Sequence, residues 1–483
     1  MTRAIDRAEA EIDRRSAAFK KELGLRDLVL TQILYVVGLG WIGTAARLGP
    51  SHVVFWLLAI VFFYVPSAVV VIHLNRLMPL EGGLYQWAKL GFSELAGFLV
   101  AWNIWIYAIV NASEIGLQVT TYLSYALGPE ARWIASDKPL ILAAACAVVT
   151  GLVFISIRGL ALGKWVHNAG GVLILVLFAA LVALPVANYF MGTLPLVRPF
   201  SLALPAFTLL NLNIFGKMGF GALGGFEYTA IVAGECRNPA RTIGRSVVIA
   251  APIIGAMFIL GTGAVLCFVR PEQVDLIGPV AQVLEAGSQP LGLVSGIAPV
   301  VIMAIAIVRV AQSSVSFTGS TRLPMVAGWD NLLPQWFVRL HAGYRTPVNS
   351  ILFVGVVTLA FAIAVVIGVG EQEAFQLLNN ASGIFYALTY LVMFALPIAG
   401  FRGAPSRAPL WLTVAAASGF LMTALYVALS IFPIVPVANV ALFTSKITLL
   451  VLGTNVAGAA LFLASRRRQR AIRESVSIAE RQA

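Results

Sequence analysis

The sequence contains little charge and little cysteine. Asp, Glu, Lys and Arg make up 11% of its 483 residues. A soluble domain typically carries roughly a quarter, so this composition argues against a soluble globular protein. Three cysteines and four histidines form neither a disulfide framework nor a set with metal-ligand spacing. We therefore expect no disulfide scaffold and no metal site.

A nucleotide-binding motif is missing as well. The Gly-Lys pairs at 163–164 and 216–217 are followed by Trp and Met, so the chain has no ATP motor of its own. The first 26 residues contain no apolar core of signal-peptide length, which favours a cytosolic tail over residues 1–27. We expect a protein that is not an enzyme, has no catalytic residues and uses no cofactor.

Apolar residues are abundant instead, at 59% of the chain with a mean hydropathy of +0.90. At about 20 residues for each membrane crossing, this length holds on the order of twelve spans. Such spans must be helices, because an open strand edge could not satisfy its backbone in lipid. The twelve continuous apolar runs lie at 28–48, 53–74, 94–122, 138–157, 164–187, 207–233, 244–269, 292–320, 348–370, 374–399, 409–432 and 441–464.

The positive charge is distributed asymmetrically. Lys and Arg number 33 against 21 Asp and Glu, a net charge of +12. With the N-terminus placed inside, 25 of the 33 cations fall in inner loops and tails and six on the outer side. The positive-inside rule explains this asymmetry without nucleic acid. We predict a multi-pass protein of the inner cell membrane, embedded in lipid, with both termini in the cytosol.

Two spans contain glycine clusters at their middles, Gly38 to Ala45 in the first and Gly219 to Glu227 in the sixth. Each glycine lowers helix stability by about 1 kcal/mol relative to alanine, which favours unwinding. Breaks in corresponding helices of two halves are typical of inverted-repeat transporters with a site at the midplane. Free N–H groups there bind a carboxylate, and free carbonyls bind an ammonium or a cation. The alternative is that the glycines only allow close helix packing.

Three segments between spans resemble signatures of the amino acid, polyamine and organocation (APC) transporter superfamily. Residues 79–87 are similar to P-x-x-G-G-x-Y-x-W, residues 235–245 to E-x-x-N-P-x-R, and residues 322–347 fit the third signature loosely. The resemblance implies an all-α, LeuT-like membrane protein of two inverted five-helix repeats. Its implied parts are the N-terminal tail 1–27, the first repeat 28–187, the second repeat 207–399, two further helices 409–464 and a basic tail 465–483.

The resemblance also implies a substrate held between broken first and sixth helices, with the third and eighth helices closing the site. Gly221 stands where many members have a bulky aromatic gate, which implies a roomier outer vestibule or a gate supplied by Phe220. Ala45 stands where a second glycine is common. The expected substrate-binding residues are Gly40, Ile42, Gly43, Thr44, Ala45, Asn111, Glu114, Ile115, Phe220, Gly221, Ala222, Leu223, Gly225 and Ser316.

Ionisable residues inside the spans are functional candidates, because such a charge costs several kcal/mol unless it is paired or hydrated. Glu227 either couples a proton or is held by free N–H groups of the broken helix. Glu114 either contacts a cationic substrate, carries a proton or neutralises Arg309, and we favour the pairing. Arg309 keeps its charge and so needs a permanent partner. Arg47 and Lys217 flank the breaks; they either attract an anionic substrate or, as we expect, extend to the interface.

The coupling ion stays open between H⁺ and Na⁺, and uncoupled exchange is a third alternative. The resemblance implies that hydroxyls of Ser313, Ser314 and Ser316 could hold a sodium ion between the first and eighth helices. The function we predict is a secondary transporter of amino acids that works by alternating access. A polyamine or amine antiporter is the alternative, and a sensor that binds without transport is a third. The sequence leaves the substrate side chain and the oligomeric state open.

Overall fold

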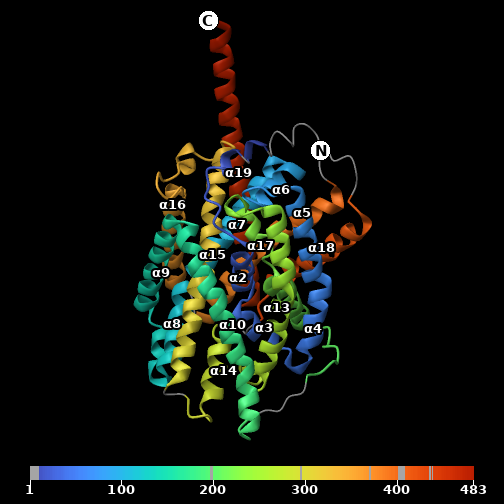
Figure 1. Ribbon diagram of the computed structural model, residues 1–483, viewed down its shortest axis with the longest axis vertical. Helices are drawn as coiled ribbons and strands as arrows, with labels where there is room; N and C mark the ends of the chain where they lie inside the picture. Colours follow the sequence, from blue (N-terminus) through green and yellow to red (C-terminus); the bar gives the residue numbers. More distant parts are fainter. Residues whose placement is uncertain are drawn as a thin grey trace.

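The computed structural model describes residues 10–482 except 13, 196–199, 294–295, 369–370, 401–407, 435–436 and 438. Among these residues the backbone forms helices and no strand, apart from an isolated bridge between Leu23 and Cys236. Figure 1 shows the helices as one upright bundle. The α-helices are α2 (Leu25–Val36), α3 (Leu39–Ala46), α4 (His52–Ala59), α5 (Val65–Leu77), α6 (Leu84–Gly91), α7 (Glu94–Ser113), α8 (Ile115–Leu127), α9 (Lys138–Arg158), α10 (Leu160–Phe190), α11 (Leu209–Gly216), α12 (Tyr228–Ile231), α13 (Pro239–Leu266), α14 (Pro279–Ser288), α15 (Ile297–Trp329), α16 (Val348–Gly368), α17 (Glu371–Ala399), α18 (Leu410–Ser430) and α19 (Val440–Gln482).

The described residues contain nine helices long and apolar enough to cross a membrane, or ten when the bent pair α2 and α3 counts as one. The chain is therefore a multi-pass membrane protein. Each of these helices coincides with one of the predicted apolar runs. The other two runs, 207–233 and 348–370, are an interrupted helix and the helix α16, whose apolar part Val348–Ala364 is shorter than a full span.

The first predicted span is interrupted at Val37 and Gly38, the start of its glycine cluster, and not at the middle of that cluster. Helix α2 ends at Val36, α3 begins at Leu39, and the two axes differ by 43°. Gly40 and Gly43 lie inside α3, which is a regular helix from Leu39 to Ala46. The expectation of an unwound segment through these glycines is therefore wrong for α3.

The sixth predicted span is interrupted over a longer stretch. After α11 the chain forms a π-helix, η4 (Lys217–Ala222), and then leaves helical geometry until α12 begins at Tyr228. Gly225 within this gap has φ of +134°, a backbone conformation that only glycine adopts readily. A second π-helix, η2 (Ile60–Tyr64), packs against η4 through the rings of Phe63 and Phe220, whose centroids are 5.7 Å apart.

Helices from both halves surround the two interruptions. Helix α2 packs against α13 and α10, while α15 packs against α7, α8 and α10. Helix α17 packs against α7 and α18, and α18 also contacts η4. The interruptions therefore face α7, α15 and α17 inside the bundle.

One end of the bundle carries the ends of the described chain. We call the surface around Glu22, Glu235, Asp330 and Ser465 the terminal face. Figure 1 shows the C-terminal part of α19 projecting beyond the other helices at the upper end. Residue Ser465 of α19 donates to the carbonyl of Leu332 at 3.0 Å, and Gln469 donates to that of Asn331 at 2.5 Å. Helix α19 is thus fastened to the segment that follows α15.

Candidate binding site

A cavity of about 140 Å³ lies beside both interruptions. This volume is about ten times the 10–15 Å³ that a single water needs, so a small molecule fits. Its lining extends from α2 and α3 across α7, α8, α15, α17 and α18. The predicted site residues that line it are Gly40, Thr44, Asn111, Glu114, Phe220, Gly221 and Ser316, together with Arg309.

Other predicted residues lie behind the cavity wall. Within α3, successive residues are rotated by about 100°, so Gly40 and Thr44 share one face and their neighbours point elsewhere. Gly43 faces Pro279, because a Cβ there would lie 2.8 Å from the Pro279 ring. Gly225 lines a second cavity of about 30 Å³. The predicted residues that line neither cavity are Ile42, Gly43, Ala45, Ile115, Ala222 and Leu223.

The space beside Gly221 is filled by an aromatic ring from the other interrupted helix. A Cβ added to Gly221 would lie 2.8 Å from Cη2 of Trp41. Phe220 is buried and packs edge-on against Tyr390, at 5.0 Å between centroids. The expectation of a roomier vestibule is therefore wrong here, because α3 supplies a bulky aromatic at this place.

Glu114 and Arg309 are linked through a glutamine and form no direct ion pair among the described residues. Arg309 Nε donates to Gln118 Oε1 at 2.5 Å, and Gln118 Nε2 donates to Glu114 Oε2 at 3.4 Å. The other carboxylate oxygen of Glu114 is buried without a hydrogen-bond donor in the described structure. Glu114 lines the cavity, and this oxygen has no partner among the described residues. The spacing of Gln118, four residues after Glu114 on one helix face, could have signalled the link.

The interruption between α2 and α3 is capped by Gln312 of α15. Its Nε2 donates to the carbonyls of Leu34 and Val37, at 2.8 and 2.7 Å. Its Oε1 accepts from Arg309 Nη1 at 2.8 Å. The last carbonyls of a helix need such donors, and the C-terminal end of a helix favours nearby positive charge. Arg309 and Gln312 thus stabilise the bend between α2 and α3.

The second interruption is held by tyrosines of α17. Tyr386 donates to Glu227 Oε1 and Tyr390 donates to Glu227 Oε2. The Tyr390 hydroxyl also accepts from the Gly225 N–H at 2.6 Å. Glu227 is fully buried, so both of its oxygens depend on these two hydroxyls. These tyrosines were not among the predicted site residues, although their i, i+4 spacing on an apolar helix is a usable signal.

A layer of tyrosines separates the two cavities. Tyr35 lines both, and its ring stacks on that of Tyr228 at 4.3 Å between centroids. Tyr228 donates to the Ser316 carbonyl, and Tyr35 donates to the Tyr107 hydroxyl at 3.4 Å. The larger cavity is therefore closed toward the terminal face by aromatic rings. On its other side, the lining reaches Ile277, which lies between α13 and α14.

Lys217 does not extend to a membrane interface. It is 2% exposed, lines the larger cavity and donates to Asn380 Oδ1 of α17 at 2.6 Å. The expected outward position is wrong because the π-helix that begins at Lys217 turns this side chain into the bundle. Arg47, by contrast, is partly exposed and donates to the carbonyl of Val274 at 3.3 Å.

The three serines of α15 are placed differently from one another. Ser314 Oγ lies 3.3 Å from Nε2 of His167, a residue of the fifth predicted span. The hydroxyl oxygens of Ser313 and Ser316 are buried without hydrogen-bond partners in the described structure. Only Ser316 lines the larger cavity.

The three signature segments meet on the terminal face. The Gly82 N–H donates to the carbonyl of Ile231 at 2.9 Å, and a Cβ at Gly83 would lie 2.7 Å from the Ala230 carbonyl carbon. Arg322 pairs with Glu235 at 2.7 Å, and both side chains are buried. These contacts close α6, α12 and the end of α15 against each other.

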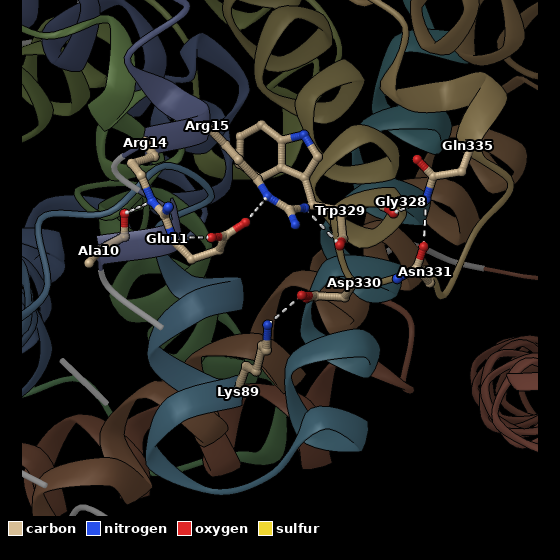
Figure 2. A network of polar contacts seen from close by, with 10 residues as sticks. All are labelled: Ala10, Glu11, Arg14, Arg15, Lys89, Gly328, Trp329, Asp330, Asn331 and Gln335. Carbon is tan, nitrogen blue, oxygen red and sulfur yellow. Dashed lines mark hydrogen bonds and ion pairs between the residues drawn. The ribbon is translucent and has the colours of Figure 1, made fainter. Parts of the chain in front are cut away.

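The segment before α2 covers this closure. Lys21 Nζ donates to the Gly234 carbonyl at 2.6 Å, and Lys164 pairs with Glu22 at 2.6 Å. Figure 2 shows Arg15 reaching the Trp329 carbonyl, at 2.8 Å, and Lys89 of α6 reaching Asp330 after α15. The N-terminal segment therefore holds together elements from both halves.

A buried carboxyl lies beneath this covering segment. Glu81 is 1% exposed, and its Oε2 accepts from the Gly234 N–H at 2.7 Å. Burial and the neighbouring Glu235 carboxylate raise the pKa of Glu81 to about 8, against the opposing effect of Arg322. The closed terminal face thus favours a protonated Glu81.

Comparisons with known proteins give the fold and the family. An uncharacterized transporter of Legionella pneumophila is 26% identical over 385 residues, which cover 78% of this chain and 81% of the relative. A probable agmatine/putrescine antiporter of Lactococcus lactis is 22% identical over 378 residues, 78% of each chain. The crystal structure of MhsT in complex with L-phenylalanine superimposes with a TM-score of 0.58 at 14% identity, covering 85% of this chain and 98% of that one.

The solved structure establishes a likeness of fold, the LeuT fold that the sequence led us to expect. The sequence pattern of the amino acid permease family matches residues 23–454, which include both interruptions, the cavity and the three signature segments. Both named relatives are transporters and not enzymes. The chain belongs to the amino acid permease family.

Proposed function

We propose that this protein is a secondary transporter that carries amino acids across the inner cell membrane by alternating access. The observation that supports it is a polar cavity in contact with both interrupted helices and closed on one side. An opening at one side at a time is what alternating access requires. The fold shared with an amino acid-bound structure and the family membership agree with this proposal.

The cavity has groups suited to both ends of an amino acid. The unpaired Glu114 oxygen can accept from an ammonium group. Gly40 belongs to the first turn of α3, where backbone N–H groups have no partner within the helix and attract a carboxylate. Ser316 Oγ adds a hydroxyl without a partner in the described structure. We propose that substrate binds among these groups.

A second candidate function is the exchange of amines. It is favoured by the similarity to a probable agmatine/putrescine antiporter. The cavity weighs against it, because Lys217 and Arg309 both line it and would repel a ligand with two positive charges. We therefore rank amino acid transport first.

For the coupling ion we propose a proton. The Leu34 and Val37 carbonyls, at the end of α2, already accept from the Gln312 amide, so a sodium ion would have to share these oxygens with that donor. A sodium site built only from the hydroxyls of Ser313, Ser314 and Ser316 would have few oxygen ligands. We further propose twelve spans with the terminal face in the cytosol, since the basic loops gather there.

The test is uptake by purified protein in liposomes. Radiolabelled amino acids and putrescine are offered with an imposed pH gradient, a sodium gradient or neither. We expect uptake of at least one amino acid, driven by the pH gradient and unchanged when sodium is replaced by choline. Uptake of putrescine alone would favour the amine antiporter, and specific binding without any flux would favour a sensor.

A further inference from the structure

We propose that the transported substrate is an acidic amino acid, whose side-chain carboxylate binds to Lys217 and Asn380. This inference rests on the transport function proposed above and names the substrate class of the same cavity. It begins from the charges of the cavity lining. Among the described residues that line the cavity, Lys217 and Arg309 are cations and Glu114 is the only carboxylate.

The two cations are not equivalent. Arg309 donates to Gln118 and Gln312, and through Gln118 it is linked to the carboxylate of Glu114. Lys217 forms no ion pair among the described residues, and its recorded hydrogen bond goes to a neutral amide. A fully buried ammonium without an anion is costly, so Lys217 is the cation for which the protein supplies no counter-ion.

A neighbouring group also lacks a partner. Asn380 is 1% exposed, and its Oδ1 accepts from Lys217 at 2.6 Å. This contact fixes the orientation of the amide, and its Nδ2 is left buried without an acceptor in the described structure. Two donors side by side, an ammonium and an amide N–H₂, are suited to one carboxylate with two oxygens.

Other residues of the cavity are suited to the ammonium group and the α-carboxylate of the ligand. The Glu114 oxygen takes the ammonium group, and the first turn of α3 at Gly40 takes the α-carboxylate, as proposed above. A zwitterion satisfies these two places and leaves Lys217 without an anion and Asn380 Nδ2 without an acceptor. An amino acid with a second carboxylate satisfies all of them, which glutamine, leucine and putrescine do not.

The ring of Tyr426 adds to the selection. The Lys217 ammonium lies 5.7 Å from its centroid, which helps to hold the cation in the cavity in the absence of ligand. An aromatic face repels a carboxylate, so the anion is directed toward the side of Lys217 that faces Asn380. The geometry therefore defines a one-sided pocket for an anion.

The experiment compares L-glutamate and L-aspartate with L-glutamine and L-leucine in the proteoliposome assay. For the unchanged protein we expect kcat/KM for an acidic amino acid to exceed that for glutamine at least about tenfold. Lys217→Gln should lower acidic uptake at least about tenfold and leave glutamine uptake within about threefold. Lys217→Arg, which keeps the charge, should retain more acidic uptake than Lys217→Gln.

Asn380→Asp is the sharper variant. It is nearly isosteric and places a carboxylate beside Lys217, so the protein then supplies the missing counter-ion. Acidic uptake should fall about tenfold or more while neutral uptake is kept or raised. Lys446→Gln is the matched control, because Lys446 lies on an exposed part of α19 and should leave both activities unchanged.

The outcomes separate this inference from the proposed function. Transport of neutral amino acids without acidic ones overturns the acidic substrate and leaves amino acid transport standing. Absence of all amino acid transport by the unchanged protein overturns both. Equal losses for acidic and neutral substrates in Lys217→Gln, with Lys217→Arg no better, overturn the role of Lys217 in selection. A chloride requirement that disappears in Lys217→Gln would assign the pocket to a free anion and also overturn the inference.

Discussion

The two interrupted helices are held by different chemistry. Between α2 and α3, two carbonyls accept from the neutral amide of Gln312. Between η4 and α12, the carboxylate of Glu227 accepts from two tyrosines of α17. The first interruption is two residues long and contains no ionisable side chain. The second contains Glu227 among its non-helical residues.

This difference means that the hydrogen bonds of the first interruption do not depend on protonation, whereas those of the second do. A neutral amide keeps its hydrogen bonds at any pH, so the first bend is a fixed feature. A buried carboxylate that depends on two hydroxyls changes its interactions when it gains a proton or when its tyrosines move. We infer that the second interruption is where the protein responds to its surroundings, and the following predictions test this contrast.

The largest effect is expected at Gly225. Its φ of +134° excludes a β-branched residue, and a Cβ there would lie 2.8 Å from the ring of Tyr35. Gly225→Val should abolish substrate binding and uptake while the protein still inserts, measured by scintillation binding and by gel filtration. Gly151→Val in α9 is the control, because a Cβ there meets nothing within 4 Å. Normal uptake by Gly225→Val would contradict a site at the second interruption.

The next effect concerns stability at the first interruption. Gln312→Leu leaves two buried carbonyls without donors, which we expect to cost about 2–4 kcal/mol. Gln118→Leu removes a link to Arg309 but uncovers no backbone group, so it should cost less. Thermal unfolding of the two purified variants in detergent checks the order. A smaller loss for Gln312→Leu than for Gln118→Leu would show that Gln312 is not the cap.

A smaller effect separates the two tyrosines of the second interruption. Tyr386 donates to Glu227, whereas Tyr390 donates to Glu227 and also accepts from the Gly225 N–H. Tyr390→Phe should therefore reduce kcat/KM for uptake more than Tyr386→Phe does. The difference between the two variants should correspond to about 1–2 kcal/mol of transition-state free energy. Equal losses would mean that the Gly225 contact does not contribute. Tyr344→Phe, on an exposed loop, is the control.

The smallest effect is a pH dependence just beyond the second interruption. The folded-state pKa of Glu81 is raised to about 8 from an ordinary value of 4.5, so the folded protein holds this proton more tightly. Its contribution to stability is greatest at acid pH and is lost as pH rises from about 4.5 to 8. Glu81→Gln should lessen the fall of melting temperature across this range. An unchanged pH profile in Glu81→Gln would assign the dependence to other groups.

The positions of the helices were largely predictable from the sequence, whereas the positions of the breaks were predictable only in part, since the second lies within its predicted glycine cluster and the first only at Gly38. Apolar runs mark the spans because lipid excludes charge, and α9, α18 and α13 begin within a few residues of the predicted runs. Helix α19 extends 18 residues beyond its run, since hydropathy measures where lipid ends and not where a helix ends. The glycine cluster of the first span extends well into α3, but only Gly38 lies in the break, and the donor that caps the end of α2 is Gln312, 275 residues from Val37.

The candidate site was predictable in part for a similar reason. Glu114, Arg309 and Glu227 stand out because charge is rare in a span, and the structure places all three near the cavity or its tyrosine wall. Gln118, Gln312 and Asn380 carry no charge and do not stand out, although each connects a charged residue to the rest of the site. Only the packing of distant helices shows which amide meets which charge.

The basic tail is part of a long helix that contacts the segment after α15. Helix α19 has 43 residues, about 65 Å of helix, which is more than twice the roughly 30 Å of a hydrocarbon core. Ser465 and Gln469, just past the apolar run, donate hydrogen bonds to the segment after α15. The same segment contains Asp330, which accepts from Lys89 and Tyr85. A chain shortened to residue 464 would still span the membrane, but the segment after α15 would lose its hydrogen bonds from Ser465 and Gln469.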